Sequence, residues 1–326
     1  MPSTIFAMPS AYPSDLRICV HMGEIVRPRA QAAPLPSARA LLVAMRPRQW
    51  TKNGLVFIAL AFTLNLQETS LLLRTVVAFF CFCALSSAGY LLNDVVDVEA
   101  DRAHPTKRLR PIAAGQVPVP LALGLGIALV AAGLGAAFLI GLLFGVLALA
   151  YALLTAVYST TLKHVVLLDI FGLAGGFVLR AAAGAVAIDV PISPWLYIAT
   201  LLGALLIALG KRRTELETLG VEAAVGHRRN LESYSLEFID QLILVVSSAA
   251  LMTYALYTFS AENLPKSHSM MLTIPVVLYG LFRYLFLIRQ GDVGAAPEEL
   301  LFRDRPLMVA VVLWALLAVT MLYLGR

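Results

Sequence analysis

The sequence predicts an all-α integral membrane protein with about nine transmembrane helices. Of its 326 residues, 60% are hydrophobic and 14% are charged, whereas soluble globular chains are about 45–50% apolar and about 25% charged. Crossing ~30 Å of hydrocarbon takes ~20 apolar helical residues, and stretches of that length recur along the chain. They are continuous runs, unlike the ~10-residue alternating segments of an outer-membrane barrel.

Six of the nine predicted helices lie in uncharged segments. Residues 111–162 are long enough for two helices joined by a Gly-rich turn near Gly133 to Gly141. Four more segments predict one helix each: 75–93, 190–210, 241–261 and 306–325. Three weaker candidates complete the count: 53–67, 165–187 with Asp169 and Arg180 inside it, and 269–288 with Arg283 inside it.

The basic residues are distributed unequally between the loops on the two sides of the membrane. With nine spans, one side holds Arg46, Arg48, Lys52, Arg102, Lys107, Arg108, Arg110, Lys163, Lys211, Arg212, Arg213, Arg228, Arg229, Arg289, Arg303 and Arg305. The other side keeps little beyond Arg74, Lys266 and Arg326. The positive-inside rule makes the basic side cytoplasmic. We therefore expect a multi-pass protein of the plasma (inner) membrane, with the N-terminus inside and the C-terminus outside.

The N-terminal segment, the cysteines and the common nucleotide and metal motifs say less about function. Residues 1–38 are rich in Pro, Ala and Ser and lack a continuous apolar core, so we expect a disordered leader followed by a single transmembrane domain at 39–326. The three cysteines show no metal or redox spacing. No phosphate-loop, dinucleotide-binding or zinc-protease motif is present. No nucleic-acid partner is expected, and the sequence is compatible with a homo-oligomer.

An acidic cluster ends the predicted helix at 75–93. Asn93, Asp94, Asp97 and Asp101 follow one another at spacings that place three carboxylates near one face of a continuous helix. Such carboxylates repel one another unless a cation joins them, and oxygen ligands alone favour Mg²⁺, which completes its shell with water and phosphates. The alternative is a solvated acidic helix end.

Two basic clusters on the same side could hold anions. Lys107, Arg108 and Arg110 follow the acidic cluster directly, and Lys211 and Arg212 end the span at 190–210, with Glu215 one turn after Lys211. Either cluster could instead serve only to orient the protein in the membrane.

Four further residues are candidates for a binding site. Tyr158 and Lys163 lie at the cytoplasmic side, near Asp169, and Arg180 lies 11 residues beyond Asp169 on the same helix face, ~16 Å deeper. An Arg at that depth should face a polar cavity or a partner. Structural pairing is the alternative.

The segment NDVVDVEADRAHPTKRLRPIAAG at 93–115 resembles the first Asp-rich motif of the UbiA-type intramembrane prenyltransferase superfamily. With Tyr158, Lys163 and the Gly-rich span at 165–187, the resemblance covers roughly residues 45–326. It implies nine transmembrane helices around a central cavity, capped by cytoplasmic loops.

The sequence departs from the superfamily pattern at one motif, and this difference indicates which branch it resembles. Where other members carry a second Asp-rich motif, this chain has GKRRTELETL, with Glu215 but no D-x-x-x-D. Together with RPRQWTKN at 46–53, LESYS at 231–235 and PEELLFRDRP at 297–306, this resembles the decaprenyl-phosphate phosphoribosyltransferase branch. That branch transfers 5-phosphoribose from phosphoribosyl diphosphate (PRPP) to a polyprenyl phosphate and makes the lipid precursor of cell-wall arabinose donors.

The resemblance implies a role for each candidate. Mg²⁺ is expected to bridge the PRPP diphosphate to Asp94 and Asp97, with Asn93 and Asp101 completing the site. Lys163, Lys211 and Arg212 are expected to hold phosphates, and Lys107, Arg108 and Arg110 to cover the ribose 5-phosphate or the diphosphate. The substrate-binding set also includes Tyr158, Asp169, Arg180 and Glu215, while the polyprenyl tail follows an apolar groove that opens to membrane lipid.

Two alternatives remain open. The first is a conventional prenyltransferase with an aromatic or haem-like acceptor. The second is a transporter that uses Asp169 and Arg180 as an ion path. Against a transporter, the charges cluster at one face and no inverted repeat is evident.

Overall fold

The computed structural model describes residues 37–63, 67–225, 233–261, 264, 267–290, 300 and 303–324, all within one compact unit that runs from Pro36 to Arg326. The side chains of residues 218–225, 323 and 324 are not described. The predicted leader, residues 1–38, lies outside the described residues except for its last two. Of these, Ser37 caps the first helix by accepting a hydrogen bond from Ala40 N at 3.2 Å.

The described residues form helices joined by turns and short loops, and no strand lies among them. The α-helices are α1 (Ala38–Met45), α2 (Ile58–Phe62), α3 (Thr69–Val96), α4 (Val98–Ala103), α5 (Val119–Ile140), α6 (Leu142–Thr160), α7 (Leu168–Ala187), α8 (Pro194–Val225), α9 (Leu236–Ser260), α10 (Ile274–Arg289) and α12 (Arg305–Leu324). Short 3₁₀ segments join them: η1 (Pro47–Phe57), η2 (Lys107–Leu109), η3 (Leu162–His164) and η5 (Ser269–Thr273). This confirms the predicted all-α membrane class.

Eight helices in the described ranges are long and apolar enough to cross a membrane. They correspond to all the predicted spans except the first, so the predicted count of nine is approximate. In place of a regular helix at 53–67, the chain forms η1 followed by α2. Eleven residues of 3₁₀ helix at ~2.0 Å each and five of α-helix at ~1.5 Å each still extend ~30 Å, about the hydrocarbon thickness.

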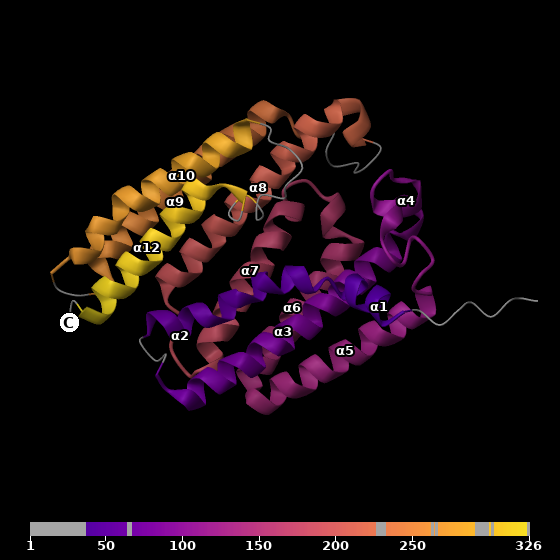
Figure 1. Ribbon diagram of the computed structural model, residues 1–326, viewed down its shortest axis with the longest axis horizontal. Coiled ribbons are helices and arrows are strands. Elements are labelled where there is room, and N and C mark those ends of the chain that lie inside the picture. The colour runs from indigo at the N-terminus through magenta and orange to yellow at the C-terminus, as the bar shows by residue number, and fades with distance from the viewer. Residues whose placement is uncertain are drawn as a thin grey trace, which may run out of the picture. The chain divides into compact units, whose positions relative to one another are not determined.

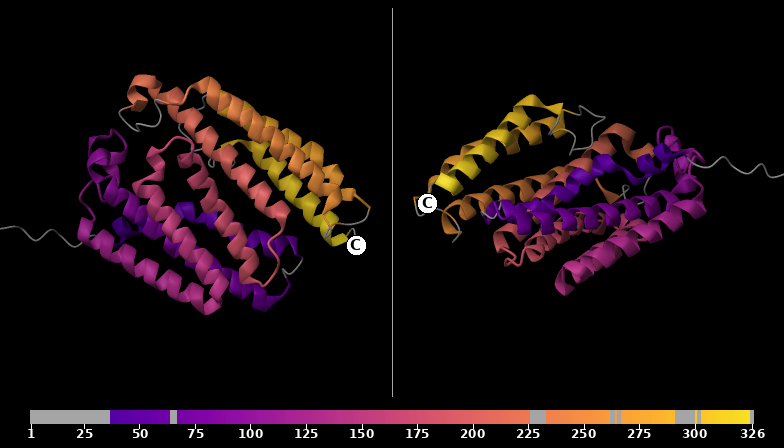
Figure 2. Two further views of the ribbon diagram at one scale, coloured as in Figure 1. Left: turned by 180° about the vertical axis from the view of Figure 1, so that it is seen from behind. Right: turned by 60° about the horizontal axis from the view of Figure 1, so that its bottom comes forward.

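The helices form a series in which sequence neighbours lie side by side. Helix α3 packs against α5 and α6, α6 packs against α7, and α7 packs against α8. Helices α9, α10 and α12 run alongside one another next to α8 in both Figure 1 and Figure 2. Arg283, which interrupts the predicted span at 269–288, lies in α10. It donates two hydrogen bonds, of 3.1 and 2.7 Å, to Asp304, the residue directly before α12.

The segment η1 packs inside this series, against α3 and α7. Its close approach to α7 depends on Gly184, because a Cβ at that position would lie 2.2 Å from the Val56 carbonyl oxygen. Asn53 of η1 is fully buried and donates hydrogen bonds to Cys83 Sγ and Ser86 Oγ of α3, at 3.3 and 3.2 Å. The irregular segment therefore brings polar groups into the middle of the helices.

Candidate functional site

The acidic cluster lies where α3 meets α4. The prediction of three carboxylates on one continuous helix was wrong in one respect, because α3 ends at Val96 and Asp97 separates it from α4. Asp94 and Asp101 are buried and share one cation, Arg110 Nη1, at 3.1 and 2.6 Å. The break at Asp97 lets this carboxylate turn toward Lys163 Nζ, 2.6 Å away.

Each carboxylate of the cluster is paired with a basic side chain from another element. Asp94 also accepts a hydrogen bond at 2.6 Å from Arg46 Nη2, and Arg46 occupies the left-handed region between α1 and η1. Lys163 of η3 is 3% exposed and lies 3.4 Å from Asn93 Oδ1 as well as pairing with Asp97. Arg46, Arg110 and Lys163 thus neutralise three carboxylates at the end of α3.

The donor set of this cluster fits Mg²⁺ only in part. Three carboxylates and the Asn93 amide supply the hard oxygen ligands that Mg²⁺ prefers. Within the described ranges, however, no three His, Cys, Asp or Glu side chains are arranged to hold a metal ion by themselves. Mg²⁺ commonly binds through one or two carboxylates together with substrate phosphates. The cluster therefore fits a metal ion that arrives with a phosphorylated substrate.

A second charged network lies at the same end of the helices. Arg212 of α8 and Asp169 of α7 are both 0% exposed, and Arg212 Nε lies 2.6 Å from Asp169 Oδ2. Glu215 accepts a second hydrogen bond from Arg212 at 2.5 Å, and Tyr234 Oη donates to Asp169 Oδ1 at 2.9 Å. Burial, together with the nearby Asp169 carboxylate, raises the pKa of Tyr234 and keeps its hydroxyl protonated.

This burial revises the predicted role of Arg212. The Arg212 guanidinium is inaccessible, and its Nε and Nη1 are already hydrogen-bonded, whereas its Nη2 has no hydrogen-bond partner among the described residues. A direct contact with a bound phosphate is therefore not available in this state. Arg212 instead fixes α8 against α7, and the adjacent Arg213 is likewise engaged, with Asp240, Glu217 and the Ile288 carbonyl oxygen.

A third polar centre surrounds Arg180 deep in α7. Its Nε donates to Asn53 Oδ1 at 2.7 Å, Nη1 to the Gly176 carbonyl at 2.9 Å and Nη2 to Tyr151 Oη at 2.6 Å. Arg180 therefore faces polar protein groups, and its role in substrate binding stays a prediction. These contacts are of the kind that the alternative of structural pairing predicts, and Asp169 is paired separately with Arg212 and Tyr234.

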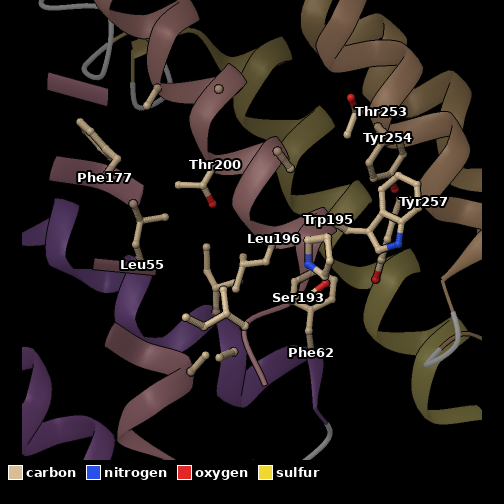
Figure 3. Close-up of a pocket in the computed structure, with 18 of the residues that line it drawn as sticks. Leu55, Phe62, Phe177, Ser193, Trp195, Leu196, Thr200, Thr253, Tyr254 and Tyr257 are labelled. Atoms are coloured by element: carbon tan, nitrogen blue, oxygen red, sulfur yellow. The ribbon is translucent and has the colours of Figure 1, made fainter. Parts of the chain in front are cut away.

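A cavity of about 1210 Å³ opens between η1, α2, α7, α8, α9 and α12. Leu55 and Phe177 lie on one side of it, and Trp195, Tyr254 and Tyr257 lie on the other (Figure 3). Its described lining is almost entirely apolar, aromatic or hydroxylic, and Lys52 is its one charged residue. None of the predicted site residues lines it, so the carboxylate cluster and the apolar cavity are separate features.

The remaining candidates lie around the two charged networks. Arg108 is exposed and Lys107 partly buried in η2, while Lys211 is partly buried one residue before Arg212. Tyr158 packs against Gly172, where an added Cβ would lie 3.0 Å from its ring, and it interacts electrostatically with Arg212. Tyr158 therefore lies beside the second network.

Four partners were not identified from the sequence as site residues. Arg46 pairs with Asp94 across 48 positions, Tyr234 with Asp169 across 65, and Tyr151 and Asn53 with Arg180 across 29 and 127. The sequence offered one weak signal for three of them, because Arg46 and Asn53 lie in RPRQWTKN and Tyr234 lies in LESYS, two short segments that resemble family motifs.

The comparisons with known proteins point to one family. The UbiA prenyltransferase family matches residues 54–303. The chain is 35% identical to the decaprenyl-phosphate phosphoribosyltransferase of Corynebacterium glutamicum over 93% of each chain. It is 34% identical to the protein of the same name from Mycolicibacterium smegmatis, over 90% of this chain and 95% of that one.

A solved structure agrees at the level of the fold. A UbiA homologue from Archaeoglobus fulgidus bound to GPP and Mg²⁺ superposes with a TM-score of 0.67 at 19% identity. The superposition covers 87% of this chain and 99% of that one.

The buried network predicts a large stability effect at Arg212. Replacing Arg212 with Met leaves the Asp169 carboxylate buried without its cation, and loss of one partner of such a pair costs ~3–5 kcal/mol. We expect a clear fall in the unfolding midpoint in detergent. Arg108→Met is the matched control and should change stability by no more than ~0.5 kcal/mol, because Arg108 is exposed.

A second variant tests the cause of this effect. Adding Asp169→Asn to Arg212→Met removes the orphaned charge and should recover part of the lost stability. An Arg212→Met protein as stable as the Arg108→Met control would contradict the pairing described here.

Proposed function

Because the chain belongs to the UbiA prenyltransferase family, we propose that it is an enzyme that transfers 5-phosphoribose from PRPP to a polyprenyl phosphate such as decaprenyl phosphate. Diphosphate is the second product. The lipid product is a precursor of the arabinose donors for cell-wall arabinan. The observation that carries the proposal is the 35% identity to the decaprenyl-phosphate phosphoribosyltransferase of Corynebacterium glutamicum over 93% of both chains.

The carboxylate cluster is the proposed donor site. Asp94 and Asp97, assisted by Asn93 and Asp101, would hold Mg²⁺ against the diphosphate of PRPP. When bound, the metal ion supplies charge stabilisation for the leaving diphosphate. Asp94, Asp97 and Asp101 are for this reason the proposed catalytic carboxylates, and a Mg²⁺-bound UbiA homologue of the same fold supports a divalent ion in this family.

The basic side chains that pair with the carboxylates can also bind the phosphates of a substrate. Arg46, Arg110 and Lys163 are already within 3.1 Å of carboxylate oxygens. Phosphate oxygens accept the same charge-assisted hydrogen bonds, so these side chains can transfer from carboxylate to phosphate as the metal takes their place. Lys107 and Arg108 extend the basic surface from η2, and Lys211 does so from α8.

The transfer itself needs little proton chemistry. An oxygen of the lipid phosphate forms a bond to C1 of the ribose as the bond from C1 to the diphosphate breaks, and the diphosphate leaves with the electron pair. The attacking oxygen is already anionic at neutral pH. Catalysis is therefore mainly positioning and electrostatic stabilisation of the charge on the leaving group. The apolar cavity can accommodate the polyprenyl tail in the plane of the membrane.

The experiment that tests this function uses PRPP labelled in the ribose, decaprenyl phosphate, Mg²⁺ and purified protein. We expect a labelled lipid, and EDTA should prevent its formation. Asp94→Asn should lower kcat/KM at least about 100-fold, because a metal ion contributes several kcal/mol to such a transition state. Glu99→Gln is the matched control, since Glu99 lies in the same segment but pairs only with the exposed Arg102.

Two outcomes would contradict the proposed function. A protein that forms no labelled lipid from PRPP, but transfers the polyprenyl group from its diphosphate to an aromatic acceptor, is a conventional prenyltransferase. Ion flux in proteoliposomes without product would indicate the transporter.

The position of the carboxylate cluster also predicts how the protein is oriented in the membrane. PRPP is water-soluble and charged, so the end of the helices that carries the carboxylates should face the cytoplasm, as the positive-inside rule also predicts. In a Cys19→Ser background, a cysteine at Arg108 should react with an impermeant maleimide only in inside-out vesicles, and one at Ser267 only in right-side-out vesicles. Cys81 and Cys83 are buried and give little background. Reversed labelling would contradict the orientation.

A further inference from the structure

One residue between η3 and α7 has a backbone conformation that its side chain disfavours. Leu167, the residue directly before α7, has φ 66° and ψ −41°. A bulky residue with positive φ is an outlier, because its Cβ crowds the neighbouring backbone. Such a conformation persists only where the surrounding structure fixes it, and residues of this kind gather at functional sites. The contacts that fix Leu167 are therefore informative about this end of the helices.

Both backbone groups of Leu167 are hydrogen-bonded. Its carbonyl accepts from the N–H groups of Ile170 and Phe171, both at 3.0 Å, and so begins α7. Its N–H donates to Tyr234 Oη at 2.7 Å, across 67 positions of the chain. A leucine side chain has no oxygen that could cap the helix, and none does so here. Tyr234 therefore fixes the residue at which the chain turns from η3 into α7.

Tyr234 is itself held in place. It is 3% exposed, and its hydroxyl donates to Asp169 Oδ1 at 2.9 Å. Asp169 is bound in turn by Arg212, and the ring of Tyr234 stacks on that of Phe238 with 6.4 Å between the centroids. A buried hydroxyl that accepts from a backbone N–H and donates to a carboxylate has a fixed orientation. The second charged network thus maintains the strained backbone at Leu167.

The same turn determines where Lys163 lies. Lys163 is in η3, four residues before Leu167, and is 3% exposed. Its Nζ lies 2.6 Å from Asp97 Oδ1 and 3.4 Å from Asn93 Oδ1. Because so few residues separate them, a change of φ at Leu167 redirects η3 relative to α7 and displaces Lys163 from the carboxylate cluster. The two charged networks are connected here through the backbone.

We propose that Tyr234 is a positioning residue: by fixing Leu167, it holds Lys163 at the carboxylate cluster, where Lys163 binds the diphosphate of PRPP. This inference deepens the proposed function and rests on it for the identity of the donor and for the role of Lys163. Tyr234 acts through the backbone of Leu167 and is not itself a ligand of the substrate. The second network, whose Arg212 is inaccessible to phosphate in this state, then contributes to donor binding from a distance.

The test is a double-mutant cycle on the Kd of PRPP with Mg²⁺, measured by calorimetry on purified protein. Tyr234→Phe removes the hydroxyl and keeps the ring, and should raise the Kd roughly tenfold, as expected for a buried N–H left without its acceptor. Lys163→Met should raise the Kd roughly 10- to 150-fold, the range for one charge-assisted hydrogen bond. Tyr234→Phe added to Lys163→Met should change the Kd by no more than about twofold, because the side chain that Tyr234 positions is gone.

A rescue by glycine identifies Leu167 as the link. Glycine adopts positive φ without strain, so Leu167→Gly in the Tyr234→Phe protein should return the Kd of PRPP to within about threefold of wild type. Asp189→Gly is the matched control, because Asp189 also has a positive φ, of 56°, but follows the opposite end of α7. It relieves the same kind of strain away from η3 and should leave the Kd of the Tyr234→Phe protein within about twofold of its value.

Amide hydrogen exchange gives a readout that does not need PRPP. In the substrate-free protein, Tyr234→Phe should speed exchange in residues 162–170 at least about fivefold. Tyr197→Phe, which removes an exposed hydroxyl from α8, should not change it. Leu167→Val makes positive φ costlier while Tyr234 is intact, because valine is branched at Cβ. It should speed the same exchange and raise the Kd of PRPP at least about threefold, which keeps the test decisive if Tyr234→Phe fails to fold.

The outcomes separate this inference from the function on which it rests. Wild-type PRPP affinity of Tyr234→Phe, multiplication of the two effects in the double mutant, or equal rescue by Asp189→Gly would each overturn the positioning role. The function still stands in those cases if wild type makes labelled lipid. If wild type makes no labelled lipid, the function is wrong, and the exchange data alone decide whether Tyr234 holds η3.

Discussion

The pairing of three carboxylates with three distant cations is the interaction on which the rest of the site depends. Asp94, Asp97 and Asp101 would repel one another at the end of α3, and burial makes that repulsion costly. Their partners come from the α1–η1 junction, from the loop after η2 and from η3. Neutralising the cluster therefore also positions the segments that surround it. In the proposed function, this neutral arrangement exchanges its cations for a metal ion that an anionic substrate brings.

The charged groups inside the helical unit lie at two different depths along the helices. The paired carboxylates and the Arg212–Asp169 network lie at one end of the helices, and Arg180 lies ~16 Å deeper than Asp169 along α7. In the two networks at the end of the helices, carboxylates neutralise the basic side chains. Arg180, in contrast, has only neutral partners among the described residues.

Much of this arrangement could be predicted from the sequence, and the remainder depended on contacts between distant elements. Uncharged runs located six of the eight membrane helices, and two apolar runs interrupted by charged residues located the other two. The spacing of Asp94, Asp97 and Asp101 located the acidic cluster. The irregular η1 segment was not predicted, because its apolar residues resemble a short span and its geometry depends on packing against Gly184. Helical periodicity predicted one face for Asp169 and Arg180, which are both buried in α7, but it could not assign their partners. Arg212 and Asn53 lie 43 and 127 positions away from them. The burial of Arg212 was likewise hidden, because a basic triplet at the end of a span also serves as a topology signal.

The exchange of cations for metal at the carboxylate cluster can be tested by one binding measurement. The Kd of PRPP is determined for wild type and Asp94→Asn, once with Mg²⁺ and once with EDTA. The account predicts opposite effects of the substitution. With Mg²⁺, Asp94→Asn should weaken PRPP binding at least about tenfold, because the metal loses a charged ligand. With EDTA, it should bind PRPP more tightly than wild type, because Arg46 and Arg110 are released from the carboxylate and remain available to phosphate. Weaker binding by Asp94→Asn in both conditions, or an unchanged Kd in both, would contradict the account.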